Sequence, residues 1–371
     1  MKKILSKIIS FAIIISLFTA CGKDNVKNNQ KEEKQTIYTS FYALQSVTKE
    51  IVGDKMEVKN LIPNGQGVHH WEPTAKDMKD LYKGSVILVN GLNLETWTEK
   101  FKSALTDLKL VEVSKGVNLL ETAHHHEEGE DHEHEHKHEH EHEHEHEHEH
   151  EHEHEHEHEH EHEHEHEHEH EHEHEHKGEN KDVVKPMTEK EEKHHSHGKY
   201  DPHIWLSLRN MKVVAKNICE QVISMDKANE SYYKENLKKV ENRLDELDKK
   251  YSDELKNSRT KSIITSHEAF AYLFNDYGLK QIAIEGLNSE SEPDLAKMKS
   301  IVEQAKKEGL KYVFYEELSE SKVEETIAKE IGGQVKMLYT IEGQTEEQAK
   351  ENKDYFTMME ENLKALVEAT K

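Results

Sequence analysis

Residues 229–258 read NESYYKENLKKVENRLDELDKKYSDELKNS, a run without Gly or Pro. The apolar residues of this run recur at steps of three and four positions: Tyr233, Leu237, Val240, Leu244 and Leu247. This spacing predicts one amphipathic helix with a single buried face. At ~1.5 Å per residue, such a helix would reach about 40 Å, which is long enough to join two lobes as a stiff strut.

Segments typical of strands and helices alternate before this run. Residues 86–89 (VILV) form a continuous apolar stretch, as expected for a buried parallel strand. Further strands are expected near residues 36–40, 56–62 and 110–113, and helices near residues 41–52, 77–82, 97–105 and 209–225. This order predicts a parallel sheet with flanking helices.

The same alternation restarts after the long helix. Strands are expected near residues 262–265, 280–284, 312–315 and 335–338, and helices near residues 269–277, 294–308, 321–331 and 348–369. The predicted fold class is therefore α/β, with two (β/α) lobes that each contain a mainly parallel sheet and are joined by one long rigid helix.

A repeat interrupts the first of these lobes at residues 132–176. His occupies every even position, 23 in all, and Glu occupies every odd position except Lys137. Because the repeat has no apolar face, we interpret residues 122–199 as a disordered, solvated insert. Its imidazoles and carboxylates are ligands that suit zinc, although a polar linker without a role could have the same composition. The candidate auxiliary ligands in the insert are His124, His125, His126, His132, His134, His136, His138, His140, His194, His195 and His197.

The net charge of the chain is dominated by this repeat. The chain has 371 residues and a formal charge of −27, and leaving out the 21 Glu residues of the repeat brings that charge to −6. Outside the repeat, Lys residues are spread among Glu and Asp along the helical segments, which is typical of a solvated surface. The composition therefore gives no indication of a nucleic-acid partner.

The first residues have the pattern of an export signal. Lys2, Lys3 and Lys7 precede an apolar run at residues 8–18, which ends in the sequence LFTACG at residues 17–22. Small residues before a Cys resemble a bacterial lipoprotein signal, in which Cys21 is lipidated and becomes the first residue. Plain secretion, or a buried Cys21, is the alternative. If Cys21 carries lipid, Cys219 is the one remaining cysteine, and no disulfide is expected.

Three histidines outside the repeat lie in loops near the ends of predicted strands. His69 follows the second strand, His203 lies in a DPHIW segment, and His267 follows the strand at residues 262–265. Ligands bind at the carboxyl ends of strands in open parallel sheets. A single histidine would more often be a packing residue. Three at equivalent places favour a zinc site, which a carboxylate would complete.

The segments around these histidines resemble those of the solute-binding proteins of zinc and manganese ABC transporters. Five separated motifs carry the resemblance in order, and it extends over the mature chain apart from a polar tether expected at residues 21–35 and the insert. They are YTSFYAL at residues 38–44, HHWEPTAKD at residues 69–77, NGLNLETW at residues 90–97, DPHIWL at residues 201–206 and TSHEAF at residues 265–270.

This resemblance implies a metal site between the two lobes, with His69, His203 and His267 as ligands. The fourth ligand maps to Glu342, with His70 or water as alternatives. Manganese-type members carry an Asp in an Asp-Pro-Leu turn at this place, whereas residues 338–343 read LYTIEG. Manganese prefers oxygen-rich, six-coordinate sites, so three imidazoles favour zinc.

The function that the resemblance implies is that of a zinc-binding receptor lipoprotein, and not of an enzyme. It would be anchored on the outer face of the cell membrane and would deliver Zn²⁺, its transported ligand, to an ABC permease and its ATPase subunit, with the insert as a metal collector. A monomer is expected. The alternatives are a manganese-type receptor, a metal buffer that acts through the insert, or a zinc hydrolase with Glu268 as its base. Cell adhesion, a role assigned to some relatives, cannot be read from the residues.

The expected domain organisation follows from these segments. It comprises a signal peptide at residues 1–20, a tether at residues 21–35, an N-terminal lobe with the insert at residues 36–228, a linking helix at residues 229–258 and a C-terminal lobe at residues 259–371.

Overall fold

The computed structural model describes residues 34–69, 71–81, 85–105, 107–122, 198–287 and 293–371. The predicted signal peptide, Cys21, His70 and nearly all of the insert lie outside these residues. Within the described part of the chain, no helix is both long enough and apolar enough to span a membrane. Where the insert leaves and rejoins the fold, Glu121 and Tyr200 form an antiparallel bridge, and Thr122 N donates to Lys199 O at 3.1 Å.

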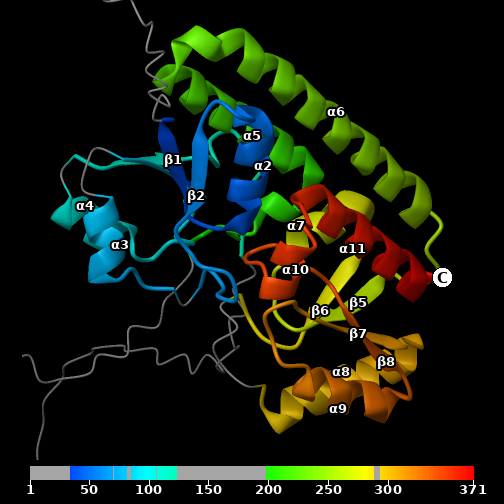
Figure 1. Ribbon diagram of the computed structural model, residues 1–371. Helices are drawn as coiled ribbons and strands as arrows, with labels where there is room; N and C mark the ends of the chain where they lie inside the picture. Colours follow the sequence, from blue (N-terminus) through cyan, green and yellow to red (C-terminus); the bar gives the residue numbers. More distant parts are fainter. Residues whose placement is uncertain (1–33, 70, 82–84, 106, 123–197, 288–292) are drawn as a thin grey trace, which may run out of the picture. The chain divides into compact units, whose positions relative to one another are not determined.

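The N-terminal part of the chain forms a four-stranded parallel sheet in the order β2-β1-β3-β4, of which Figure 1 labels β1 and β2. Its strands are β1 (Thr36–Thr39), β2 (Glu57–Asn60), β3 (Val86–Val89) and β4 (Lys109–Glu112). The helices that alternate with them are α2 (Tyr42–Val52), α3 (Ala75–Asp80) and α4 (Thr98–Ala104). The predicted parallel sheet is therefore confirmed.

The C-terminal part of the chain repeats this topology in a second parallel sheet, in the order β6-β5-β7-β8. Its strands are β5 (Ser262–Thr265), β6 (Lys280–Ala283), β7 (Tyr312–Tyr315) and β8 (Gln334–Met337). Its helices are α7 (Ala271–Tyr277), α8 (Leu295–Glu308), α9 (Lys322–Ile331), α10 (Glu346–Lys350) and α11 (Tyr355–Thr370). In both sheets the first strand pairs with the second strand on one side and with the third strand on the other, so the strand order changes direction at the first strand. Ligand sites of α/β proteins form at such points.

The long helix predicted from the sequence is α6 (Glu230–Leu255), whose 26 residues extend about 39 Å. It buries Tyr233, Val240, Leu244 and Leu247 on the face that their spacing predicted. Figure 1 shows α6 running alongside α5 (Leu208–Met225) and α11.

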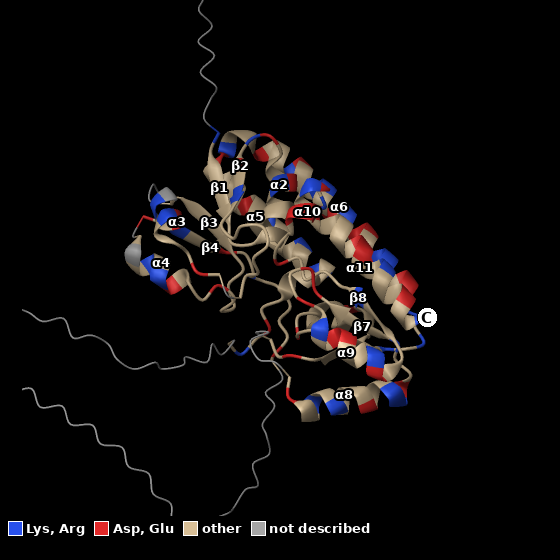
Figure 2. Cartoon of the chain, turned by 60° about the horizontal axis from the view of Figure 1, so that its bottom comes forward, with Lys and Arg blue, Asp and Glu red and all other residues tan. Residues whose placement is uncertain are grey.

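Polar contacts also fasten α6 to the helices that accompany both sheets. Asn236 Nδ2 donates to Ile51 O of α2 at 3.1 Å, and Tyr251 Oη donates to Met359 O of α11 at 2.6 Å. Lys and Arg positions are interspersed with Asp and Glu positions along α6 and α8 (Figure 2), as expected from the sequence for a solvated surface.

Two hydrophobic cores hold these layers together. The larger one packs residues of both sheets against α5, α6 and α11, and includes Trp97, Trp205 and Tyr355, each almost fully buried. The smaller one lies where α8 and α9 cover the second sheet, and includes Ile264 and Val313. Because the larger core is shared, the loops at the ends of both sheets are held against one another.

One predicted element is wrong. The helix expected over residues 348–369 is two helices, α10 and α11, separated at residues 351–354. Asn352 adopts a left-handed conformation with φ of 54°, and Asp354 Oδ1 accepts a hydrogen bond from Thr357 N at 2.7 Å. Asp354 therefore caps the start of α11, and the chain forms two helices here instead of one.

Cys219 lies on α5, and its side chain is buried without a disulfide. Burial raises the pKa of its thiol to about 11, so the reactive thiolate form is scarce at neutral pH. The domain boundaries expected from the sequence stay a prediction.

Candidate metal centre

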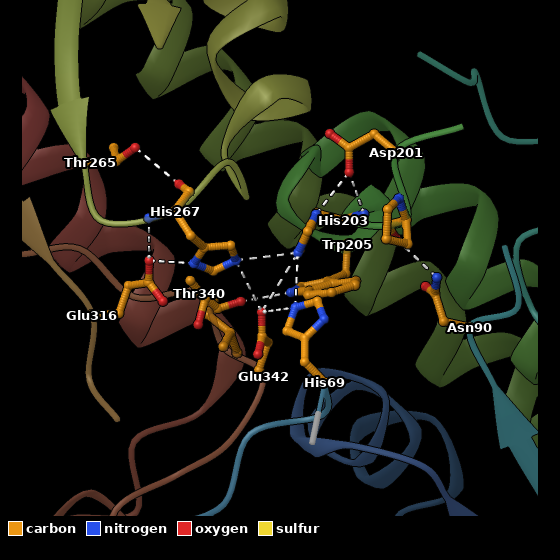
Figure 3. Close-up of polar contacts among 12 residues, drawn as sticks. His69, Asn90, Asp201, His203, Trp205, Thr265, His267, Glu316, Thr340 and Glu342 are labelled. Atoms are coloured by element: carbon orange, nitrogen blue, oxygen red, sulfur yellow. Dashed lines mark hydrogen bonds and ion pairs between the residues drawn. The ribbon is translucent and has the colours of Figure 1, made fainter. Parts of the chain in front are cut away.

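Four loops, two of them directly after strands β5 and β8, bring together the four predicted ligands (Figure 3). His69 lies in the loop that follows β2, His203 immediately precedes the short 3₁₀ helix η1 (Ile204–Leu206), and His267 comes two residues after β5. Glu342 lies in the turn after β8. One ligand atom from each residue lies within 4.8 Å of the other three.

The distances among these atoms match a four-coordinate zinc ion. Nε2 of His203 lies 3.2 Å from Nε2 of His69 and 3.4 Å from Nε2 of His267. Oε1 of Glu342 lies 3.3, 3.7 and 3.8 Å from the Nε2 atoms of His69, His203 and His267. A tetrahedron with metal–ligand bonds of about 2.0–2.1 Å has edges of about 3.3 Å. A zinc ion would therefore fit between these atoms with small shifts of the side chains.

Carboxylates orient two of the imidazoles. His203 Nδ1 lies 2.8 Å from Oδ1 of Asp201, and His267 Nδ1 lies 2.5 Å from Oε1 of Glu316 (Figure 3). A charged carboxylate only accepts hydrogen bonds, so ionised Asp201 and Glu316 favour a proton on each Nδ1, and each neutral imidazole can then direct the Nε2 lone pair to the centre of the site. Two such lone pairs 3.4 Å apart repel each other unless a proton or a cation lies between them.

The charges of the metal-free site reflect this arrangement. Burial would lower the pKa of His267, but the charge and hydrogen bond of Glu316, together with Glu342, raise it to about 9. For Glu342, burial alone would raise the pKa of the carboxyl, but His69 and His267 hold that pKa below its usual value. The metal-free protein therefore keeps a proton on His267 opposite a charged Glu342, and a cation would replace that proton.

Burial also raises the pKa of Asp201, to about 7, despite the hydrogen bond that it accepts from the backbone N–H of His203. A cation bound to His203 would favour the charged form of this carboxylate, since opposite charges stabilise each other at short range. Cation binding and the orientation of His203 by Asp201 therefore support each other.

The atom of Glu342 that faces the histidines accepts no hydrogen bond from the described residues. This Oε1 belongs to a side chain that is only 7 % exposed. A buried carboxylate oxygen without a hydrogen bond is costly, and a cation at the centre would satisfy it. This observation favours Glu342 as the fourth ligand over the alternatives considered from the sequence.

A second buried carboxylate holds the turn that carries Glu342. Glu317 accepts hydrogen bonds from Thr340 N at 2.9 Å and from Ile341 N at 2.8 Å. Ile341 has a φ of 59°, a conformation that is strained for a β-branched residue. Trp205 Nε1 donates to Thr340 O at 2.7 Å, which ties the same turn to the segment after His203. The strained turn is therefore fixed from two sides.

The NGLNLETW motif at residues 90–97 supports the turn at residues 201–203 (DPH), and its residues are not among the predicted metal ligands. Glu95 accepts hydrogen bonds from Asn90 N at 2.7 Å and from Ser40 Oγ at 2.7 Å, at the ends of β3 and β1. Asn90 Nδ2 in turn donates to Pro202 O at 2.9 Å, next to His203. The ends of two strands of the first sheet are thereby linked to the backbone that presents His203.

The structure thus brings together the four residues for which ligation was predicted, and it adds partners that the sequence reasoning missed. Asp201 was quoted only as part of a motif, and Glu316 and Glu317 were not singled out. Glu316 and Glu317 lie directly after β7, and this position could have indicated a role at the site, because side chains at the carboxyl ends of parallel strands meet at one edge of the sheet. Glu268, considered as a base, does not belong to the four-residue group.

We expect Asp201→Asn to weaken zinc binding roughly 10- to 100-fold, because the imidazole of His203 would lose a charged acceptor that fixes its orientation. Competition with a chromophoric chelator measures this change. Asp245→Asn, on the exposed face of α6 where Asp245 pairs with Lys212, is the matched control and should leave the affinity unchanged. An unchanged affinity in Asp201→Asn would contradict the orienting role.

Three imidazoles and one carboxylate, buried between two parallel sheets that are joined by one long helix, define a solute-binding receptor for a transition-metal cation. The chain belongs to the ZnuA family, the periplasmic component A of the zinc-uptake complex, which matches residues 37–369. This is a family of solute-binding proteins, so the chain is not an enzyme.

Curated relatives support the family assignment. The high-affinity zinc uptake system protein ZnuA of Bacillus subtilis (strain 168) is 32% identical over 354 residues, which cover 94% of this chain and 92% of the relative. The zinc-binding protein AdcA of Streptococcus pyogenes serotype M3 is 32% identical over 365 residues. That alignment covers 97% of this chain and 61% of AdcA, so the chain spans about three fifths of the AdcA relative.

Solved structures share the fold. The Zn(II)-bound ZnuA-like domain of Streptococcus pneumoniae AdcA has a TM-score of 0.63 at 26% identity, with 91% of this chain and 99% of that chain covered. The metal-dependent lipoprotein YcdH of Bacillus subtilis has a TM-score of 0.64 at 29% identity, with 91% and 100% covered. The laminin-binding protein Lmb of Streptococcus agalactiae, at 23% identity and a TM-score of 0.66, has a similar fold.

Proposed function

We propose that this chain is the extracytoplasmic zinc receptor of an ABC uptake system, held at the membrane by a lipid on Cys21 and acting as a monomer. It would bind one Zn²⁺ ion through His69, His203, His267 and Glu342 and hand the ion to a permease. The observation that carries the proposal is the cluster of three Nε2 atoms and Oε1 of Glu342, all within 4.8 Å of one another, in which Oε1 has no hydrogen-bond partner among the described residues.

The donor set supports zinc over manganese as the transported ion. Three nitrogen atoms and one oxygen atom suit a four-coordinate zinc ion, whereas manganese prefers oxygen-rich, six-coordinate sites. The ligands are also nearly closed off from water, since the side chains of His203 and His267 are at most 1 % exposed. Removal of water strengthens the attraction between ligands and cation, as a receptor that works at low zinc concentration requires.

Calorimetric zinc titration of the form that begins at Lys23, with and without the insert, tests this proposal against a metal buffer. The insert can be replaced by a short Gly-Ser linker, because residues 122 and 199 are already hydrogen-bonded to each other. The receptor proposal predicts one tight event in both forms, with weaker binding added by the insert. If the form without the insert shows no tight event, the buffer is the better explanation.

The same titration with manganese tests the manganese-type alternative. We expect Mn²⁺ to bind the form without the insert far more weakly than Zn²⁺ and to be displaced by it. Comparable affinities would favour the manganese-type receptor. Sedimentation of the zinc-bound form tests the expected monomer.

A further inference from the structure

A cavity of about 370 Å³ opens beside the metal centre. Its lining includes three of the four ligands, His69, His267 and Glu342, and it continues to the exposed residues Ser319 and Glu320. His203, which is fully buried, is not among the described residues that line it. The cavity is therefore a path between solvent and the open side of the site.

Carboxylates dominate the outer part of this cavity. Glu285 follows β6, Glu316 follows β7, and Glu324 lies in the first turn of α9. No Lys or Arg is found among the described residues of the lining, and Lys322, which is not one of them, pairs with the exposed Glu320. Apart from the protonated His267, the described lining therefore has no basic side chain to balance these negative charges.

Glu324 gives an independent sign that a ligand belongs in this cavity. The residue is only 3 % exposed, and its Oε2 has no hydrogen-bond partner among the described residues. A buried carboxylate oxygen without a partner is disfavoured unless water or a cation satisfies it. Burial and the repulsion from Glu324 and Glu316 also raise the pKa of Glu285, to about 7. An added cation would relieve that repulsion.

We propose that Glu285, Glu316 and Glu324 form an outer station that attracts a hydrated divalent cation and passes it to His267 and Glu342. The proposal deepens the proposed function and rests on it. Among the described residues, these three carboxylates are not a group with ligand atoms within 4.8 Å of one another, so they would hold the ion through its water shell. Six waters occupy roughly 180 Å³, which fits in the cavity.

The expected consequence is kinetic. A cleft lined by charges of one sign raises the on-rate of an oppositely charged ligand by about 10- to 1,000-fold, and salt screens the effect. The carboxylates of the station act most strongly on an ion that is still in the cavity. Their loss should therefore slow association more than it weakens the final complex.

Stopped-flow binding of Co²⁺ to the full chain tests the proposal, because cobalt absorbs visible light strongly only when it is four-coordinate. The double variant Glu285→Gln/Glu324→Gln removes two charges of the station without touching a ligand. The double variant Glu303→Gln/Glu330→Gln removes two exposed charges of α8 and α9 outside the cavity and is the matched control. Measurements at about pH 8.5, above the pKa of Glu285, keep its carboxyl charged.

We expect the station variant to associate about tenfold more slowly than the wild type at low salt, with a weaker salt dependence and a dissociation constant changed less than about threefold. The control should match the wild type. Unchanged association in the station variant, or a loss that appears only as faster dissociation, would overturn the proposal. Absence of the four-coordinate spectrum in the wild type would instead overturn the proposed function on which it rests.

Discussion

The variant His69→Ala/His203→Ala/His267→Ala is expected to lose the tight zinc-binding event altogether. Four-ligand zinc sites bind with about 10–16 kcal/mol, so each ligand contributes roughly 3–4 kcal/mol, or at least about 100-fold in affinity. Loss of three ligands leaves a single carboxylate, Glu342, which cannot hold the ion. Calorimetry on the form without the insert measures the loss, because histidines of the insert cannot then bind zinc in its place.

Two further measurements distinguish loss of the ligands from loss of the fold and test Glu342 separately. Replacement of His203 and His267 removes the partners of Asp201 and Glu316, so circular dichroism must confirm that the variant is folded without metal. The single variant Glu342→Gln keeps the size of the side chain and should weaken binding about 100-fold if Glu342 is the fourth ligand. One tight equivalent of zinc in the folded triple variant would mean that the site lies elsewhere.

Zinc affinity is expected to rise about tenfold per pH unit towards pH 9 and then to level off. His267 holds a proton in the metal-free site because Glu316 and Glu342 raise its pKa to about 9, and zinc can bind only after that proton leaves. Between pH 7 and pH 9 the gain should be about 50-fold, because half of the His267 side chains still carry the proton at pH 9. The pKa of Glu342 lies below its usual value, so Glu342 stays charged throughout this range.

Calorimetry in buffers of different ionisation enthalpy counts the protons released. We expect about one proton per zinc near pH 7.5 and fewer above pH 9. Glu316→Gln should move the plateau to lower pH, since it removes the charge that raises the pKa of His267. Proton release that does not change between pH 7 and pH 9 would contradict this account.

The same proton has the opposite effect on the metal-free fold. A histidine whose pKa is raised on folding stabilises the native state fully below about pH 6.5, and this contribution is lost as the pH rises through 9. The melting temperature of the metal-free protein should therefore fall over this range through His267.

Much of the fold could be predicted from local patterns. The spacing of Tyr233, Val240, Leu244 and Leu247 determined the buried face of α6, because a helix places residues three and four apart on one side. The apolar run of β3 and the strand–helix alternation likewise determined two parallel sheets. The break between α10 and α11 was not predicted, because it depends on the left-handed conformation of Asn352 and on the cap that Asp354 provides for α11.

For the metal centre too, the sequence indicated one part and the tertiary structure decided the rest. Residue types and their places near strand ends were enough to single out three histidines, since ligand chemistry belongs to the residues themselves. Glu342 was suggested only by the resemblance to known metal receptors. Only the tertiary structure decided that Oε1 of Glu342 faces the three Nε2 atoms, 273 residues along the chain from His69. That direction depends on a strained turn at Ile341, which Glu317 and Trp205 hold through hydrogen bonds from distant segments. Local sequence cannot specify such a turn, because its cost is offset only by contacts that form when the two sheets pack together.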